Sequence, residues 1–144
     1  MLTALPKGYI FFEFSIPRMG KRVDVVLVMS GLIFVLEYKV GTEHYDNHSI
    51  LQTVDYALDL KNFHEGSHDK TIIPILVSTN AEERLPELIY SKDSVADVLC
   101  ANKETLGNII RFCINSKNWQ PFDPVEWSVS IYKPTPTIVE AAQA

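Results

Sequence analysis

The sequence RVDVVLVMSGLIFVLEYKV, residues 22–40, contains two apolar runs rich in Val, Ile, Leu and Phe on either side of Ser30-Gly31. Because glycine supplies the positive φ that a tight turn needs, this pattern predicts a β-hairpin with its loop at those two residues. Residues 32–36 are apolar on both faces, which is typical of a central strand covered on each side. The hairpin is therefore predicted to form the middle of a sheet.

Charged residues close both strands of this hairpin. With the loop at residues 30 and 31, Asp24 lies opposite Glu37 and Arg22 lies opposite Lys39, with cross-strand Cβ atoms about 5 Å apart. Alternation along the strands puts Asp24, Glu37 and Lys39 on one face. Two carboxylates this close repel each other unless one is protonated or a cation sits between them. The pattern predicts either a divalent metal ion there, or an Asp24–Lys39 ion pair with Glu37 pointing to solvent.

One more strand is predicted before the hairpin. Residues 9–16, YIFFEFSI, are aromatic and apolar with partial alternation, which puts Phe12, Phe14 and Ile16 on one face and Glu13 on the other. The short connection that follows makes the first three strands an antiparallel meander.

That connection carries three cations around a glycine turn, at Arg18, Lys21 and Arg22. Side chains and backbone N–H groups there could bind phosphates, and the alternative is a solvated turn that keeps the end of the sheet soluble. The chain has a net charge of −5, yet residues 1–39 hold five Lys and Arg against three acidic residues. A phosphate-binding surface is therefore expected near the hairpin.

A helix is predicted over residues 50–64, because Ser49 and Gln52 match a capping box and Gly66 lies just beyond the end. Two stripes follow its length. One is apolar, with Leu51, Val54 and Leu58 joined by Ala57 at the edge, and the other is half-polar, with Gln52, Tyr56, Asp59 and Phe63. Gln52 and Tyr56 could reach the carboxylates of the hairpin or a phosphate. The alternative assigns Gln52 to the capping box and Tyr56 to packing.

In the second half of the chain, a strand-helix-strand order predicts a crossover connection. Residues 71–79 are predicted to form a strand that joins the sheet parallel to the last strand of the hairpin. Pro74 indicates that this strand lies at an edge or contains a bulge. Residues 95–101 predict a further strand, residues 103–115 a helix capped by Asn102, and Asp123-Pro124 the start of a short helix that holds Trp127. The predicted fold is α/β, with a mixed sheet and helices on both faces.

These residues carry a resemblance to a known family. Asp24 followed by Glu37-Tyr38-Lys39 on the next strand resembles the PD-(D/E)XK nuclease signature, and QTVDY at residues 52–56 is similar to the Q-x-x-x-Y element of its RecB-like branch. The longer segments IPRMGKRVDVVLVMSGLIFVLEYKVG, QTVDYALDLKNFHEGSHDK and YKPTPTIVEAAQA resemble the nuclease-like domain that precedes a P-loop helicase segment in a group of bacterial proteins. The resemblance implies a restriction-endonuclease-like core.

The resemblance also implies an activity, a metal and partners. Asp24, Glu37 and the Tyr38 carbonyl would bind Mg²⁺ or Mn²⁺, and Lys39 would orient a water molecule that the metal acidifies for attack on a phosphodiester bond of DNA, or of RNA. Gln52 and Tyr56 would position the water or the phosphate. The alternative is an inactive module of the same fold that binds nucleic acid or docks a helicase.

The same resemblance sets the expected domain organisation. Residues 1–133 would form the nuclease-like domain, and residues 134–144 would begin a linker helix to a C-terminal helicase or ATPase region. The family commonly carries an acidic residue on a helix before the first strand, for which this sequence has no room. We therefore expect a domain excised from a longer protein, in which Glu13 could serve as a third acid or simply face solvent.

Two other residue classes bear on function. All four histidines, His44, His48, His64 and His68, form two H-x-x-x-H pairs that would suit Zn²⁺, although a chance cluster on a solvated rim is the alternative. Cys100 and Cys113 fall in a predicted strand and helix, which suits buried thiols rather than a disulfide. The sequence has no apolar run long enough for a membrane span and no signal peptide, so a cytoplasmic location is expected.

Overall fold

A computed structural model describes residues 7–16 and 18–136 of the chain. In the described residues, five strands form one mixed sheet in the order β1-β2-β3-β4-β5. Strands β1, β2 and β3 are antiparallel neighbours, whereas β4 is parallel to β3 and β5 is parallel to β4. The predicted meander followed by a helix and a parallel strand is therefore confirmed.

The elements follow one another along the chain with mostly short connections. The strands are β1 (Gly8–Ser15), β2 (Arg22–Met29), β3 (Leu32–Lys39), β4 (Thr71–Ser78) and β5 (Leu99–Ala101). The helices are α1 (Asn47–Phe63), α2 (Leu106–Asn115) and α3 (Pro124–Ser128), with a short 3-10 turn, η1 (Glu65–Ser67), after α1.

The β2–β3 turn has the predicted position. Ser30 and Gly31 have φ values of 53° and 85°, which is the geometry of a two-residue turn whose twist matches that of the strands. A side chain at Gly31 would also collide with the backbone of Gln120, so glycine is required there by close approach as well as by φ. The strands pair in the predicted register from Met29–Leu32 to Val25–Leu36.

Strand β1 differs from its prediction at Glu13. This residue has a φ of 48°, which lies in the left-handed region and breaks the alternation of side chains. Phe14 and Ile16 therefore pack in one core with Phe11, whereas Phe12 is 74% exposed and lies by a hollow on the other face. The expectation that Phe12, Phe14 and Ile16 share one face was wrong because alternation holds only while every residue stays extended.

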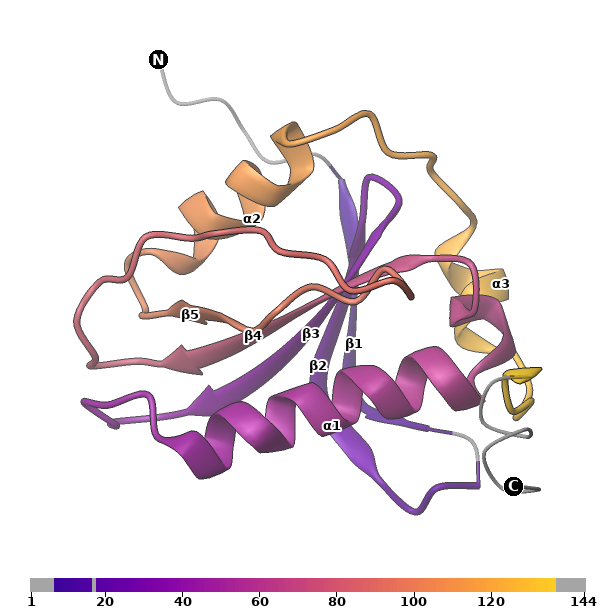
Figure 1. Cartoon of the computed structure of the whole chain (residues 1–144), viewed down its shortest axis with the longest axis horizontal. Helices are drawn as coiled ribbons and strands as arrows, with labels where there is room; N and C mark the ends of the chain where they lie inside the picture. The colour runs from indigo at the N-terminus through magenta and orange to yellow at the C-terminus, as the bar shows by residue number, and fades with distance from the viewer. Residues whose placement is uncertain (1–6, 17, 137–144) are drawn as a thin grey trace.

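Two hydrophobic cores cover the two faces of the sheet. On one face, Ala57 and Leu60 of α1 lie against β3 and β4 and share a core with Val26, Ile33 and Ile72 among others. On the other face, α2 packs against a second core that includes Phe34, Leu36 and Ile75. Figure 1 shows α1 and α2 on opposite sides of the sheet. The prediction of helices on both faces is thus confirmed.

Helix α1 begins three residues earlier than predicted, and its cap is a different residue. The Asp46 side chain accepts hydrogen bonds from the Ser49 backbone N–H (2.8 Å) and the Ser49 hydroxyl (3.0 Å), so Asp46 rather than Ser49 is the N-cap. Of the predicted apolar stripe only Ala57, at its edge, is buried, whereas Leu51 is 62% exposed. The helix instead buries mostly small and polar residues: Ser49, Thr53, Ala57, Leu60 and Lys61.

Strand β4 is not at the edge of the sheet, contrary to the expectation from Pro74. Strand β5 pairs only with residues 75–77 of β4, so the missing N–H of Pro74 falls just before that pairing begins. Strand β5 is accordingly shorter than predicted, and residue Val95 makes only an isolated bridge to Ile72. On the side of β3, Pro74 pairs with Val35, and the parallel ladder continues through this pair.

Helix α2 begins at Leu106, three residues later than predicted, and its N-cap is Thr105 rather than Asn102. Asn102 instead accepts hydrogen bonds from the backbone N–H groups of Glu104 and Thr105 (2.9 Å each) in the turn before the helix. Helix α3 has Asp123 as its N-cap and buries Trp127, as predicted. The expected linker helix falls mostly on residues 137–144, outside the described part of the chain. Among the described helices, none has the length and apolarity needed to cross a membrane.

Candidate functional site

The two hairpin strands separate where their charged residues begin. Their ladder ends at Val25–Leu36, one residue before Asp24 and Glu37, so Arg22 and Lys39 are not paired as expected. The Asp24 carboxylate instead accepts a hydrogen bond from the Tyr38 backbone N–H at 3.3 Å. A side chain thus replaces a backbone acceptor at this point, which holds the Asp24 carboxylate close to β3.

Glu37 is an ionisable side chain placed almost entirely out of water, with 5% of its surface exposed. Burial raises the pKa of the Glu37 carboxyl, and the charge of Asp24 raises it further, whereas Lys39 acts to lower it. The Lys39 ammonium lies 3.4 Å from Glu37 Oε1, but Oε2 is buried and has no hydrogen-bond partner. One oxygen of this carboxylate is therefore left for a cation or a proton to satisfy.

A chain of polar contacts links Lys39 to helix α1. The Lys39 ammonium donates to Gln52 Oε1 at 3.3 Å, and the Gln52 amide donates to the Tyr56 hydroxyl at 3.2 Å. Because Asp46 caps the helix, Gln52 does not take the capping-box role and its side chain is available for this contact. Gln52 thereby fixes the Lys39 ammonium between itself and Glu37.

Sequence reasoning did not identify Ser78, which lies next to this group. Ser78 pairs with Lys39 in the β3–β4 ladder, is fully buried, and has a hydroxyl without a hydrogen-bond partner. Alternation along β4 puts it on the same face as Ile72, which belongs to the core under α1. The only sequence signal was its place at the end of a predicted strand, and the parallel register was needed to pair it with Lys39.

The three predicted phosphate-binding cations have different surroundings. Lys21 forms an ion pair with Asp59 of α1 at 2.6 Å, and this contact raises the pKa of the Lys21 ammonium. Arg18 lies over the Tyr132 ring, 5.6 Å from its centroid, and Arg22 is exposed at the start of β2. Lys21 and Arg18 thus already have partners within the chain, so they do not form one free basic surface.

The four histidines have different surroundings, with His64 buried and His44 and His48 exposed. Within residues 7–16 and 18–136, no group of three or more His, Cys, Asp or Glu side chains could hold a metal ion. His64 is instead buried among Phe14 and Trp127, with Nδ1 2.8 Å from the Ser67 hydroxyl. For the same reason Glu13 does not complete a triad with Asp24 and Glu37. Cys113 is buried and Cys100 is half-buried, and both are free thiols.

The donors at the strand ends suit a hard divalent cation. Two carboxylates, one of them with an unpartnered buried oxygen, lie at the end of the hairpin, and Mg²⁺ or Mn²⁺ prefers oxygen ligands while keeping several waters. The Tyr38 side chain packs into the core on the α2 side of the sheet, so this residue has only its backbone carbonyl to offer. The residues present therefore fit such an ion, with two carboxylates as its protein anchors.

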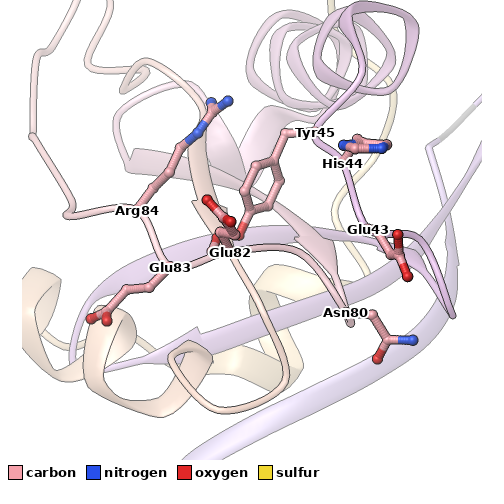
Figure 2. Close-up of a pocket in the computed structure, with 7 residues that line it drawn as sticks. All are labelled: Glu43, His44, Tyr45, Asn80, Glu82, Glu83 and Arg84. Atoms are coloured by element: carbon pink, nitrogen blue, oxygen red, sulfur yellow. The ribbon is translucent and has the colours of Figure 1, made fainter.

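A separate hollow of about 630 Å³ lies at the ends of the parallel strands β3 and β4 (Figure 2). Its walls come from the loops that follow those strands, and Tyr45 and Arg84 pack together there, with the guanidinium 4.6 Å from the ring centroid. The charged side chains that line it are Glu43, Glu82, Glu83 and Arg84. This acidic balance opposes phosphate, and of the predicted residues only His44 lines the hollow.

Comparisons of the chain with models of known protein families, with curated proteins and with solved structures find no match.

Proposed function

We propose that this protein is a metal-dependent phosphodiesterase that hydrolyses DNA, or RNA, at the Asp24–Glu37–Lys39 group. The observation that carries the proposal is the buried Glu37 carboxylate, which has Asp24 and Lys39 as neighbours and one oxygen, Oε2, without a hydrogen-bond partner. A buried carboxylate with an unpartnered oxygen is costly to stability, so a carboxyl group whose pKa is raised by burial and a neighbouring charge marks a candidate site. The restriction-endonuclease-like arrangement belongs to the same proposal.

The residues have distinct roles in this proposal. Asp24, Glu37 and the Tyr38 carbonyl would hold Mg²⁺ or Mn²⁺, which when bound supplies Lewis acidity and lowers the pKa of coordinated water. Lys39 would offset the negative charge that develops on the phosphate oxygens in the transition state. Gln52 and Tyr56 would act as positioning residues, because they fix the Lys39 ammonium through hydrogen bonds of 3.3 Å and 3.2 Å. Arg22, which is exposed at the start of β2, would hold the backbone of the substrate.

Metal binding can be tested separately from cleavage. Calorimetric titration with Mn²⁺ should show binding to the wild-type protein and weaker or no binding to Asp24→Asn and Glu37→Gln. The matched control is Glu104→Gln, because Glu104 is an exposed carboxylate before α2 and away from the hairpin. Equal binding by all four proteins would contradict the proposed ligands.

Cleavage is tested with Lys39→Met on single- and double-stranded DNA and on RNA. We expect cleavage that requires Mg²⁺ or Mn²⁺, and a loss of roughly 10²-fold or more in the variant, which is typical when a group that stabilises transition-state charge is removed. Circular dichroism must show that the variant is folded. Cleavage at the wild-type rate by both Lys39→Met and Asp24→Asn would exclude this mechanism.

The second candidate is an inactive module that binds nucleic acid or docks a helicase or ATPase region. It is favoured by the small number of acidic ligands, since the described residues provide two carboxylates and no third at the site. It is also favoured by Lys21, whose charge is already paired with Asp59. This candidate predicts nucleic-acid or partner binding without Mn²⁺ binding that depends on Asp24 and Glu37.

A further inference from the structure

Ser78, the last residue of β4, has a hydroxyl whose burial is not explained by packing alone. The side chain is fully buried, and its oxygen has no hydrogen-bond partner within the described part of the chain. By contrast, the buried hydroxyls of Ser49 and Thr53 in α1 are both bonded, to the Asp46 carboxylate and the Ser49 carbonyl. A buried hydroxyl without a partner is costly, and alanine at this position would avoid the cost. Ser78 is therefore a candidate for a role beyond packing.

The sheet places Ser78 beside Lys39. The two residues are partners in the parallel β3–β4 ladder, and Glu37 pairs with Leu76 two positions earlier. Partners in a ladder point to the same side of the sheet, and neighbouring strands lie about 4.8 Å apart. Lys39 contacts Gln52, so this is the side that α1 covers. The flexible four-carbon stem of Lys39 can therefore bring its ammonium to the Ser78 hydroxyl while the backbone stays in place.

The Lys39 ammonium is not saturated by its present contacts. It has three N–H donors, and its partners among residues 7–16 and 18–136 are Gln52 Oε1 at 3.3 Å and Glu37 Oε1 at 3.4 Å. A charge-assisted hydrogen bond between an ammonium and a carboxylate is usually about 2.7–2.9 Å long, so the contact with Glu37 is loose. One donor thus remains, and a second is only weakly held.

We propose that Ser78 is a positioning residue for Lys39: its hydroxyl accepts a hydrogen bond from the Lys39 ammonium when Glu37 binds a metal ion. The inference rests on the metal site of the proposed function. A divalent cation on Glu37 would compete with Lys39 for the same carboxylate, and the two positive charges repel each other. Ser78 on β4 and Gln52 on α1 then hold the ammonium through neutral oxygens. The third donor of Lys39 is left for a phosphate oxygen of the substrate.

Exchange of the Lys39 ammonium protons with water tests this contact without any need for cleavage. In protein labelled with ¹⁵N at lysine Nζ, the Lys39 resonance is the one that Lys39→Met removes, and Mg²⁺ should shift it. With Mg²⁺ bound, these protons should exchange about two- to tenfold faster in Ser78→Ala than in the wild type, the factor that one hydrogen bond is usually worth. Without Mg²⁺ the two proteins should exchange equally, because Lys39 then contacts Glu37 and Gln52.

Two further variants separate the hydrogen bond from an effect on packing or stability. Ser67→Ala removes another fully buried serine hydroxyl, in η1 just before the opposite end of β4, and should exchange like the wild type. Ser78→Cys fills the space of the serine with a weak acceptor and should exchange as fast as Ser78→Ala. Exchange at the wild-type rate in Ser78→Cys would mean that Ser78 acts through packing, which would overturn the proposal.

The outcomes also distinguish this inference from the proposed function. If Mg²⁺ shifts the Lys39 resonance but Ser78→Ala and the wild type exchange at equal rates, the metal site stands and the role of Ser78 is overturned. If Mg²⁺ leaves the resonance unchanged, Lys39 does not leave Glu37 and the role of Ser78 is overturned too. The Mn²⁺ titration described above then shows whether the metal site fails with it.

The cleavage assay provides a second readout. Ser78→Ala should lower kcat by about tenfold or more with little change in KM, because misplacement of Lys39 weakens an interaction made in the transition state. Ser67→Ala should leave kcat close to that of the wild type. A loss confined to KM, or an equal loss of kcat in both variants, would contradict a positioning role for Ser78.

Discussion

Glu37 and His64 are both buried ionisable side chains, and burial shifts their pKa values in opposite directions. Burial raises the pKa of Glu37, because the neutral form is the protonated acid, whereas it lowers the pKa of His64 to about 4, because its neutral form is the deprotonated imidazole. His68 lowers the pKa of His64 further. Glu37 lies at the candidate site, whereas His64 packs between Phe14 and Trp127, so the first pKa shift belongs to the proposed site and the second to core packing.

The shift of His64 predicts acid sensitivity. Its pKa is about 4 in the folded state against 6.5 for an exposed histidine, so the unfolded state takes up a proton first as the pH falls. The free energy of unfolding is therefore not reduced by His64 above pH 6.5. It falls by about 3 kcal/mol as the pH drops from 6.5 to about 4. Urea unfolding at stepped pH should therefore show a shallower acid loss for His64→Phe than for the wild type.

The control for this experiment is His48→Gln, because His48 is exposed. Its free energy of unfolding should follow that of the wild type across the same pH range. If His64→Phe loses as much stability in acid as the wild type does, His64 is not the residue responsible.

At the scale of elements, the position of α1 is decided by small side chains. Ser49, Thr53 and Ala57 face the sheet and are buried, so the helix backbone can lie close to β3 and β4. Close approach lets the Gln52 side chain reach Lys39 on β3. The hydrophobic pattern favoured Leu51 as a buried residue, but small polar residues can be buried when the backbone or a neighbouring side chain takes their hydrogen bonds, as Ser49 O does for Thr53 at 2.7 Å.

The N-cap of α1 gives the prediction at this scale. Asp46→Ala should lower the thermal midpoint, whereas Asp46→Asn should keep most of the stability because an amide oxygen can also cap. The hydrogen bond from the Ser49 backbone N–H holds the pKa of Asp46 below 3.8, so the capping contribution is present above that pH and is lost as the pH falls further. Thermal unfolding at neutral pH and near pH 3 measures both effects.

Asp55→Ala is the matched variant, because Asp55 is an exposed aspartate in the middle of the same helix. We expect it to leave the thermal midpoint nearly unchanged, since alanine is the better helix former. An equal loss in both variants would mean that Asp46 acts through its charge alone and not as a cap.

At the scale of the whole molecule, Trp127 joins three segments that are distant in sequence. Its ring lies 5.0 Å from that of Phe14 in β1 and 4.8 Å from that of His64, and its indole N–H donates to the Ser67 hydroxyl in η1 at 2.9 Å. Further along, Lys133 and Thr135 donate backbone hydrogen bonds to the end of α1. The last described segment is thus fixed to the same helix that carries Gln52 and Tyr56.

Removal of this ring should be costly. Trp127 is 3% exposed, and Trp127→Ala should lower the free energy of unfolding by about 3–5 kcal/mol, the usual range for a large buried aromatic residue. Trp119→Ala should cost less, because Trp119 is only half-buried. Denaturant unfolding followed by circular dichroism compares them, and equal losses would argue against Trp127 as the main link.

The amino-acid sequence by itself determined the features that depend on neighbouring residues. The Ser30-Gly31 turn fixed the hairpin register through backbone φ, which put Asp24 and Glu37 just beyond the last pair of the ladder. The cap at Asp123 followed from an equally local signal, whereas the parallel crossover to β4 followed from the strand-helix-strand order of the chain. The turn and the cap are predictable because their energies arise within a few residues.

Only the tertiary structure decided the features that depend on packing between distant segments. The reversal of side-chain faces at Glu13, the burial of Ser49 and Thr53 in place of Leu51, and the pairing of Ser78 with Lys39 all require knowledge of what lies opposite each residue. The same holds for the unpartnered oxygen of Glu37, because a charge at a strand end is solvated or buried according to what covers it. Composition and periodicity describe one segment at a time, whereas burial is a property of several segments together.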